Sequence, residues 1–286
     1  MASVSKPKTA APVLTPEGRP DDDFVIDQDW DGYTERDHTV WRRLFDRQSA
    51  LLPGRACEAF LEGLRATGAA AEGIPRFDAA SDALERTTGW RIVAVAGLVP
   101  DDVFFWHLAN RRFPVTNWIR APEQMDYLQE PDVFHDFFGH VPLLTNRVFA
   151  DYMCAYGRGG LKALRLDALH YLARLYWYTV EFGLIRDGNG LRLYGSGIAS
   201  SRSESVYALE DTAPNRIAFD LLRIMRTEYR IDDLQKLYFV IDDFDQLFDA
   251  TRPDFTPYYE ALRHGTDLAP EDVLDSDLLV PPNPSP

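Results

Sequence analysis

The sequence is poor in cysteine and in positive charge. Cys57 and Cys154 are the two cysteines among 286 residues, too few for a disulfide framework or a thiolate metal site. We expect both to be reduced, buried thiols. Lys and Arg number 30 against 45 Asp and Glu, a formal charge of −15, and no run of five basic residues occurs. This balance argues against nucleic acid or an anionic membrane as a partner, because both require clustered positive charge.

Long hydrophobic runs are also missing. Residues 1–20 lack the apolar segment of a secretory signal. The longest apolar stretches, 92–100 and 175–185, are shorter than the roughly 18 residues that span a bilayer, and Glu181 interrupts the second. We therefore expect a cytoplasmic protein.

Apolar and aromatic residues, at 45% and 13% of the chain, are sufficient for a substantial core. The composition of residues 1–20 predicts a flexible tail, and that of residues 266–286 predicts an acidic, Pro-rich tail. Between them, residues 21–265 are expected to form one domain. Its fold class is mainly α-helical with small β ribbons at the edge.

Hydrophobic periodicity and turn residues indicate where the elements lie. Helices are predicted at 38–52, 56–67 and 78–87, from Pro100 onwards, and at 151–156, 161–183, 204–209 and 215–226. Strands are predicted at 90–96, 113–119, 191–194 and 237–241. Gly68 and Gly89 are expected to end the second and third helices, and Asp78 to cap the start of the third.

Two of the six histidines, His135 and His140, lie five residues apart. On a regular α-helix this spacing places their side chains about 140° apart around the helix axis. The two histidines can therefore bind one ion only if the helix bends. Gly139 is expected to provide that bend. A chance pair of unrelated histidines remains the alternative. Phe137 and Phe138 between them favour a buried segment, in which an ion would satisfy both imidazoles.

Glu181 is the best candidate for a third ligand. It lies in the apolar and aromatic stretch 175–185, where an unpaired carboxylate would be costly. A salt bridge to Arg174 or Arg120 is the structural alternative. Two imidazoles and one carboxylate with open coordination positions are typical of non-haem Fe(II) oxygenases, whereas a closed zinc site would require four ligands.

Three motifs, in this order, resemble the pterin-dependent aromatic amino acid hydroxylases: PDVFHDFFGHVPL at 131–143, YWYTVEFGL at 176–184 and YGSGIASS at 194–201. The resemblance extends over residues 30–255 and is strongest to bacterial members that hydroxylate phenylalanine. It implies the family's single-domain catalytic fold, a helical basket around one iron, with residues 21–265 as the catalytic domain. A monomer is expected, because the regulatory domain and tetramerisation helix of the animal enzymes are missing.

The resemblance also implies the reaction and its cofactors. The enzyme would convert L-phenylalanine to L-tyrosine with O2 as co-substrate, using Fe(II) and tetrahydrobiopterin or a related tetrahydropterin. Its small-molecule partners would then be the amino acid and the pterin. Hydroxylation of tryptophan or tyrosine is an alternative within the family. A zinc-dependent hydrolase with the same ligands, and a binding protein without turnover, are alternatives from other classes.

By position in these motifs, the iron ligands would be His135, His140 and Glu181. The implied substrate residues are Arg120, which would pair with the substrate carboxylate, Leu128, Trp177 as a pocket wall, Gly197 and Ser200. The implied pterin residues are Val95, Gly97, Leu98, Val99, Phe104 and Asp136. Animal members usually carry Thr in place of Leu128 and Glu in place of Asp136.

Each carried-over role has a structural alternative. Arg120 could neutralise surface acids, Trp177 could be an ordinary core residue, and Ser200 could cap the helix that follows. The order of the three motifs favours the functional interpretation in each case.

Overall fold

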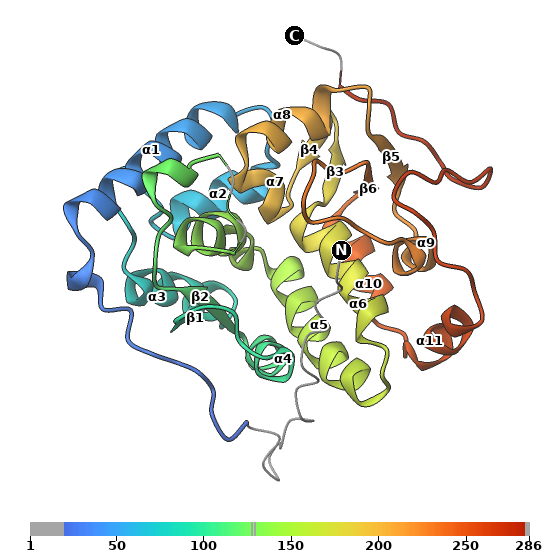
Figure 1. Cartoon of the computed structure of the whole chain (residues 1–286), viewed down its shortest axis with the longest axis horizontal. Helices are drawn as coiled ribbons and strands as arrows, with labels where there is room; N and C mark the ends of the chain where they lie inside the picture. The colour runs from blue at the N-terminus through green and yellow to red at the C-terminus, as the bar shows by residue number, and fades with distance from the viewer. Residues whose placement is uncertain (1–19, 127, 129, 284–286) are drawn as a thin grey trace, which may run out of the picture.

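The computed structural model describes residues 20–126, 128 and 130–283, so the tail expected at 1–20 lies almost entirely outside the described residues. Helices dominate the fold (Figure 1). The α-helices are α1 (Glu35–Leu51), α2 (Glu58–Ala66), α3 (Phe77–Thr87), α4 (Asp101–Ala109), α5 (Arg147–Arg165), α6 (Leu169–Tyr176), α7 (Ser196–Ser200), α8 (Arg202–Glu210), α9 (Leu221–Arg226), α10 (Phe244–Ala250) and α11 (Thr256–Arg263). Within the described ranges, no helix combines the length and the apolar character needed to cross a bilayer.

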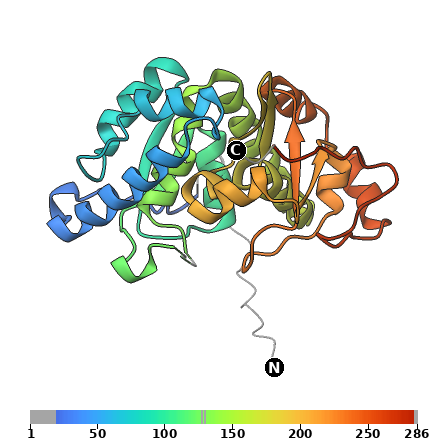
Figure 2. The ribbon, with the colours of Figure 1, turned by 90° about the horizontal axis from the view of Figure 1, so that it is seen from above.

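Two further helices are π-helices, η3 (Phe134–His140) and η5 (Trp177–Glu181). Short 3-10 helices lie at η1 (Trp30–Gly32), η2 (Pro122–Gln124) and η4 (Pro142–Thr145). Seen from above, α1–α3 gather at one end of the molecule and the chain after α8 lies at the other (Figure 2).

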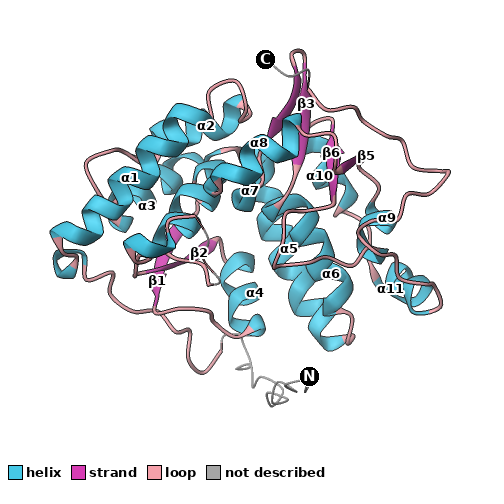
Figure 3. Ribbon diagram, turned by 45° about the horizontal axis from the view of Figure 1, so that its top comes forward, coloured by secondary structure: helices cyan, strands magenta, loops and turns pink. Residues whose placement is uncertain are grey.

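The strands form two separate small sheets (Figure 3). In the first, β1 (Arg91–Val95) pairs in parallel with β2 (Arg112–Thr116). The second has the order β4-β3-β6-β5, and its strands are β3 (Leu184–Asp187), β4 (Gly190–Leu193), β5 (Asn215–Ala218) and β6 (Leu237–Ile241). β3 and β4 form an antiparallel hairpin, whereas β6 is parallel to both β3 and β5. The predicted fold class, mainly helical with small ribbons, is confirmed.

The core around η3 is aromatic. Phe134, Phe137 and Phe138 are fully buried, and the Trp41 ring meets both Phe134 and Phe137 edge-on. Phe77 of α3 stacks on Phe137. These contacts bury large apolar areas, so helices α1 and α3 hold the π-helix in a fixed orientation.

α5 is continuous where the sequence analysis expected a break between residues 156 and 161. A Cβ at Gly157 would collide with the backbone of Ala109, and one at Gly160 with the ring of Phe105. Both glycines therefore permit close packing of α4 against α5. The packing more than offsets the low helix propensity of glycine, and the predicted break is wrong.

The single helix predicted at 161–183 is also wrong. α5 ends at Arg165, and Asp167 takes a left-handed conformation (φ 50°) that no helix continues through. α6 starts at Leu169, and the chain changes from α to π geometry at Trp177.

The helix predicted at 215–226 divides into β5 and α9. Residues 215–218 pair with β6, and the Asp220 carboxylate then accepts from the backbone N–H of Arg223, 2.8 Å away, to cap α9. α3 likewise starts at Phe77 with Arg76 in the cap position. Its Phe77 N–H donates to the Gln28 side chain, so the prediction of Asp78 as the cap is wrong. Gly68 and Gly89 follow α2 and α3 with positive φ, as predicted.

The segment predicted as a C-terminal tail contacts the larger sheet and α9. Leu279 bridges to Ile217 on the outer edge of β5, and the Asn283 side chain bonds to both backbone groups of Leu191. Arg223 of α9 pairs with Asp277, and both side chains are almost fully buried. These contacts attach residues 266–283 to the rest of the fold.

Candidate metal centre and substrate pocket

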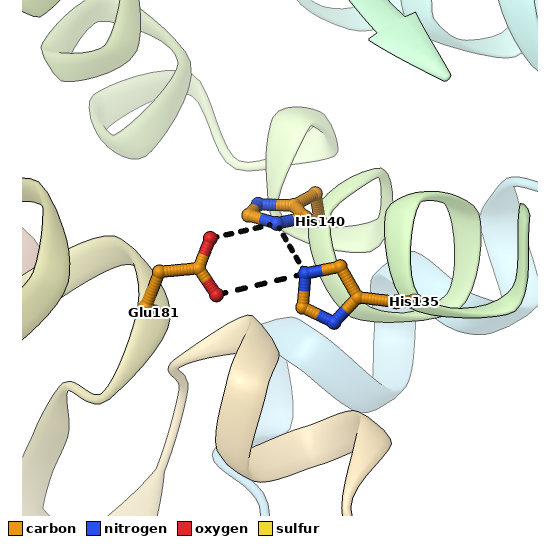
Figure 4. A group of neighbouring side chains, drawn as sticks. All are labelled: His135, His140 and Glu181. Atoms are coloured by element: carbon orange, nitrogen blue, oxygen red, sulfur yellow. Dashed lines mark hydrogen bonds and ion pairs between the residues drawn. The ribbon is translucent and has the colours of Figure 1, made fainter. Parts of the chain in front are cut away.

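The side chains of His135, His140 and Glu181 converge on one point, although Glu181 comes from a different helix (Figure 4). The two histidine Nε2 atoms are 3.2 Å apart. Glu181 Oε1 lies 3.1 Å from His140 Nε2, and Oε2 lies 3.6 Å from His135 Nε2. These three residues are the group of His, Cys, Asp and Glu side chains, within the described part of the chain, that is close enough to hold an ion.

The π-helical form of η3 brings the two histidines together. In a π-helix the backbone bonds join residues five apart, so His135 and His140 lie one above the other without any break. The expectation of a bend at Gly139 is therefore wrong. Gly139 is needed for a different reason, because a Cβ there would meet the Ser196 carbonyl oxygen at 2.9 Å and block α7 from packing on η3.

Glu181 ends the second π-helix, in which the Phe182 N–H donates to the carbonyl of Trp177 five residues earlier. Ser196 of α7 donates its hydroxyl to Glu181 Oε2, 2.9 Å away. Burial alone would raise the pKa of Glu181, but the neighbouring histidines and this hydroxyl lower it to about 2. Burial lowers the pKa of His135 to about 4, which favours the neutral imidazole that metals bind.

The alternative partners of Glu181 are occupied elsewhere. Arg174 pairs with Asp267 and Arg120 pairs with Asp132, each through two N–H groups. The interpretation of Glu181 as half of a buried salt bridge to either arginine is therefore wrong.

Ser200 fixes the tautomer of His135. Its hydroxyl donates to the Ser196 carbonyl at 2.8 Å, so it must accept the bond that joins it to His135 Nδ1, 2.9 Å away. The proton of the imidazole then lies on Nδ1, and the Nε2 lone pair points at Glu181 and His140. The N-cap of α8 is Ser201, so the alternative role of Ser200 as the cap is wrong.

The donor set fits a divalent iron. For ligand bonds of about 2.1 Å at right angles, donor atoms lie about 3.0 Å apart, close to the 3.1–3.6 Å that separate the two histidine Nε2 atoms from each other and from the Glu181 carboxylate oxygens. Two imidazole nitrogens and one carboxylate, with no thiolate, make the ligand set of non-haem Fe(II) sites.

A cavity of about 500 Å³ opens beside the three ligands. Its lining includes His135, Glu181 and all five residues predicted to contact the substrate: Arg120, Leu128, Trp177, Gly197 and Ser200. A volume of this size accommodates a small organic ligand.

Arg120 is buried, so its interpretation as a partner of surface acids is wrong. Its Nε and Nη2 donate to the two carboxylate oxygens of Asp132, both at 2.8 Å. Asp132 is itself fully buried and also accepts from the backbone N–H groups of Arg120 and His135. The pair thus joins the arginine of the cavity to the first turn of the histidine helix.

Trp177 forms part of the cavity wall, and it is not an ordinary core residue. Its ring stacks on Tyr229 at 4.4 Å and packs against Phe182 at 4.7 Å. Its Nε1–H donates to Gln235 Oε1, 2.9 Å away.

A family model described as biopterin-dependent aromatic amino acid hydroxylase matches residues 30–261 of the chain. The phenylalanine-4-hydroxylase of Ralstonia nicotianae is 66% identical over 258 residues, which cover 90% of this chain and 82% of that protein. The phenylalanine-4-hydroxylase of Caulobacter vibrioides is 56% identical over 265 residues, covering 93% and 90%. The chain belongs to the biopterin-dependent aromatic amino acid hydroxylases.

Solved structures of this family share the fold. The cobalt-bound phenylalanine hydroxylase of Chromobacterium violaceum superposes with a TM-score of 0.89 at 60% identity, over 90% of this chain and 93% of that one. The iron- and phenylalanine-bound structure from the same organism gives a TM-score of 0.87 at 57% identity, over 91% and 95%. The family resemblance inferred from the three motifs is therefore confirmed.

The residues that the resemblance assigns to the family's pterin are not part of the cavity lining. Val95 ends β1, and Gly97, Leu98 and Val99 follow it in the loop before α4. Phe104 of α4 meets Tyr176 edge-on, and Tyr176 stacks on the His140 ring. These ring contacts connect Phe104 to the candidate ligand His140, and none of the three rings lines the cavity.

Asp136 has a structural contact that the resemblance did not indicate. It is buried in η3, and its carboxylate accepts from the backbone N–H of Thr116 at the end of β2. Burial raises its pKa to about 6. Asp136 thereby joins the first sheet to the histidine helix.

Several cavity residues escaped the sequence analysis. So did Asp132, the buried partner of Arg120, although its place three residues before His135 could have suggested it. The missed cavity residues include Glu204 of α8 and, from the loop before β6, Ile231, Asp232, Asp233, Leu234 and Gln235. The sequence carried no signal for that loop, because it reaches the site through tertiary packing.

Proposed function

We propose that the protein is an iron(II)- and tetrahydropterin-dependent monooxygenase that converts L-phenylalanine to L-tyrosine with O2. The observation that carries this proposal is the set of three ligands, His135, His140 and Glu181, beside a cavity that contains a buried arginine. Membership of the family supports the cofactors, and the relatives named phenylalanine-4-hydroxylase support the substrate.

Bound iron and reduced pterin would together supply the activation of O2. The chain would hold the iron through His135, His140 and Glu181, while Ser200 and Ser196 orient His135 and Glu181 through their hydroxyl groups. Arg120 would donate to the substrate carboxylate through the N–H groups that its pair with Asp132 leaves over. The walls of the cavity would orient the aromatic ring toward the ligands and exclude water from it.

Two observations disfavour the alternatives. A zinc hydrolase with two histidines on a regular helix has them four residues apart and a glutamate beside the first, whereas here they are five apart on a π-helix and Asp136 follows. A binding protein without turnover has no need of an intact ligand set. Tryptophan and tyrosine remain the competing substrates.

The decisive experiment compares substrates directly. Ferrous-loaded protein is incubated separately with phenylalanine, tyrosine and tryptophan in the presence of tetrahydropterin and O2, and the product is identified by mass spectrometry. We expect tyrosine from phenylalanine at the highest kcat/KM, and zinc-loaded protein to be inactive. Faster hydroxylation of another amino acid, or turnover with zinc, would contradict the proposal.

Replacing Arg120 with lysine is expected to raise the KM for phenylalanine by about fivefold or more, because lysine keeps the charge but loses the two-pronged geometry. The KM for pterin should change much less. The matched control is Arg252→Lys, at an exposed arginine that pairs with Asp249. Unchanged amino acid kinetics in Arg120→Lys would remove Arg120 from the substrate site.

Replacing Trp177 with phenylalanine removes ring area from the cavity wall and makes room for a bicyclic substrate. A mis-sized group in an apolar pocket is worth about 10-fold or more in kcat/KM. We therefore expect the preference for phenylalanine over tryptophan to fall at least several-fold, measured as the ratio of the two kcat/KM values. An unchanged ratio with lowered stability would place the specificity wall elsewhere.

We also propose that the protein acts as a monomer in the cytoplasm. Both cysteines are free and buried, as suits a reducing compartment. Light scattering during gel filtration should give a mass near 32.6 kDa, and a dimer mass would refute the monomer.

A further inference from the structure

Two aromatic rings, Tyr229 and Phe182, and one hydrogen bond to Gln235 hold the indole of Trp177. Stacking on Tyr229, with the rings only 16° from parallel, fixes the plane of the indole. Stacking alone does not distinguish the ring from the same ring turned by 180° about its Cβ–Cγ bond, because that half-turn keeps the plane and exchanges the two edges. The bond from Nε1 to Gln235 Oε1 fixes this remaining freedom and so determines which edge of the ring faces the cavity.

The amide of Gln235 is itself held in one orientation. Its Nε2 donates to the carbonyls of Arg230 and Asp233, at 3.0 and 3.3 Å. Turning the amide over would direct its oxygen at two carbonyls and its NH2 group at the indole N–H. Gln235 is almost fully buried, so those mismatches would be costly.

The backbone of Gln235 is anchored to α8. Its N–H donates to Glu204 Oε1 at 3.1 Å, and the Tyr238 hydroxyl donates to the same oxygen. Glu204 is buried and lines the same cavity. One continuous set of bonds therefore runs from Tyr238 in β6 through Glu204 and Gln235 to the wall formed by Trp177.

On the basis of the proposed function, we propose that Gln235, anchored by Glu204, is a positioning residue that orients Trp177 and thereby sets the preference for phenylalanine over tryptophan. Gln235 acts through the indole N–H. Its loss leaves that N–H without its acceptor and frees the ring to turn into the space where the substrate ring lies.

A double-mutant cycle tests this route. The variants are Gln235→Leu, Trp177→Phe and the double variant. The phenylalanine side chain introduced at position 177 has no N–H group to donate to Gln235, so Gln235 has nothing to orient in that background. We expect Gln235→Leu to lower the phenylalanine-to-tryptophan ratio of kcat/KM by about fivefold or more in the native background. In the Trp177→Phe background the same change should alter the ratio by less than about twofold.

Binding measurements make the test independent of turnover. Calorimetry on anaerobic, iron-loaded protein gives the Kd for L-phenylalanine and for L-tryptophan, and the ratio should follow the same pattern. If wild-type protein binds phenylalanine but forms no tyrosine, the proposed function fails while the binding cycle still tests Gln235. Gln246→Leu is the matched control, because the Gln246 side chain accepts from the Asp242 backbone N–H before α10 and does not line the cavity, and it should leave both ratios unchanged.

Three results would overturn the proposal. The first is an unchanged phenylalanine-to-tryptophan ratio of kcat/KM in Gln235→Leu. The second is an equal change of this ratio in the native and Trp177→Phe backgrounds. The third is a Gln235→Leu variant that loses thermal stability but keeps the ratio. If Gln235→Leu fails to fold, Gln235→Asn replaces it in the cycle. Asparagine keeps the amide but is one methylene shorter, so its oxygen cannot reach the indole without giving up its other bonds.

Discussion

Replacing His135, His140 or Glu181 with alanine is expected to abolish tyrosine formation while leaving the fold intact. Each change removes one of three protein ligands, and the two that remain would hold iron poorly and direct it wrongly. The measurements are product formation, iron content after desalting and the circular dichroism spectrum. His264→Ala, at an exposed histidine far from the ligands in sequence, is the control and should keep full activity.

If one of the three alanine variants kept stoichiometric iron and formed substantial product, the replaced residue would not be a ligand. Loss of activity together with the loss of the native spectrum would not support the assignment of that ligand either. In that case Glu181→Gln, which keeps the size of the side chain, distinguishes a folding defect from the loss of a ligand.

Replacing Asp132 with alanine is expected to destabilise the protein by about 3–5 kcal/mol, because it leaves the buried Arg120 charge without its partner. Asp132 is 0% exposed and accepts four hydrogen bonds, two from the guanidinium and two from backbone N–H groups. Urea unfolding measures the loss. Asp249→Ala, which breaks an exposed pair with Arg252, should change stability by less than about 1 kcal/mol.

The stabilisation by Asp132 also depends on pH. Burial would raise its pKa, but the bonds and charge of Arg120 outweigh burial and hold the pKa below the ordinary 3.8. A carboxyl group with a depressed folded pKa stabilises the fold above its unfolded pKa, and this contribution disappears as the pH falls through the folded value. The difference between wild type and Asp132→Ala should therefore be full at pH 7 and shrink in acid. A difference under 1 kcal/mol at pH 7 would contradict the prediction.

The three candidate ligands could be found from the sequence because their chemistry is visible in single residues. Two histidines in an aromatic segment and one carboxylate in an apolar one are unusual wherever they occur. Their geometry could not be found, because the spacing of five was interpreted on a regular helix. The π-helix brings the two histidines together at this spacing, and it is packed by Trp41 and Phe77, more than fifty residues upstream.

The errors in the fold have the same origin. Glycines at 157 and 160 resemble a helix end until α4 is seen to pack on them. Residues 215–218 have a helical pattern in isolation and become a strand because β6 lies beside them. Asp132 and Gln235 were missed because their roles depend on hydrogen bonds to Arg120 and Trp177, and the sequence does not show these pairings.

The contacts of the C-terminal segment have a consequence for the order of events during synthesis. Arg223 and Arg174 lie in α9 and α6, but their carboxylate partners, Asp277 and Asp267, lie far downstream and are synthesised much later. A chain emerging from the ribosome folds from its N-terminal part onwards. Until residue 277 has been synthesised, the surface between α6 and α9 carries two arginine charges without these partners, so the final packing of this half must wait for both carboxylates.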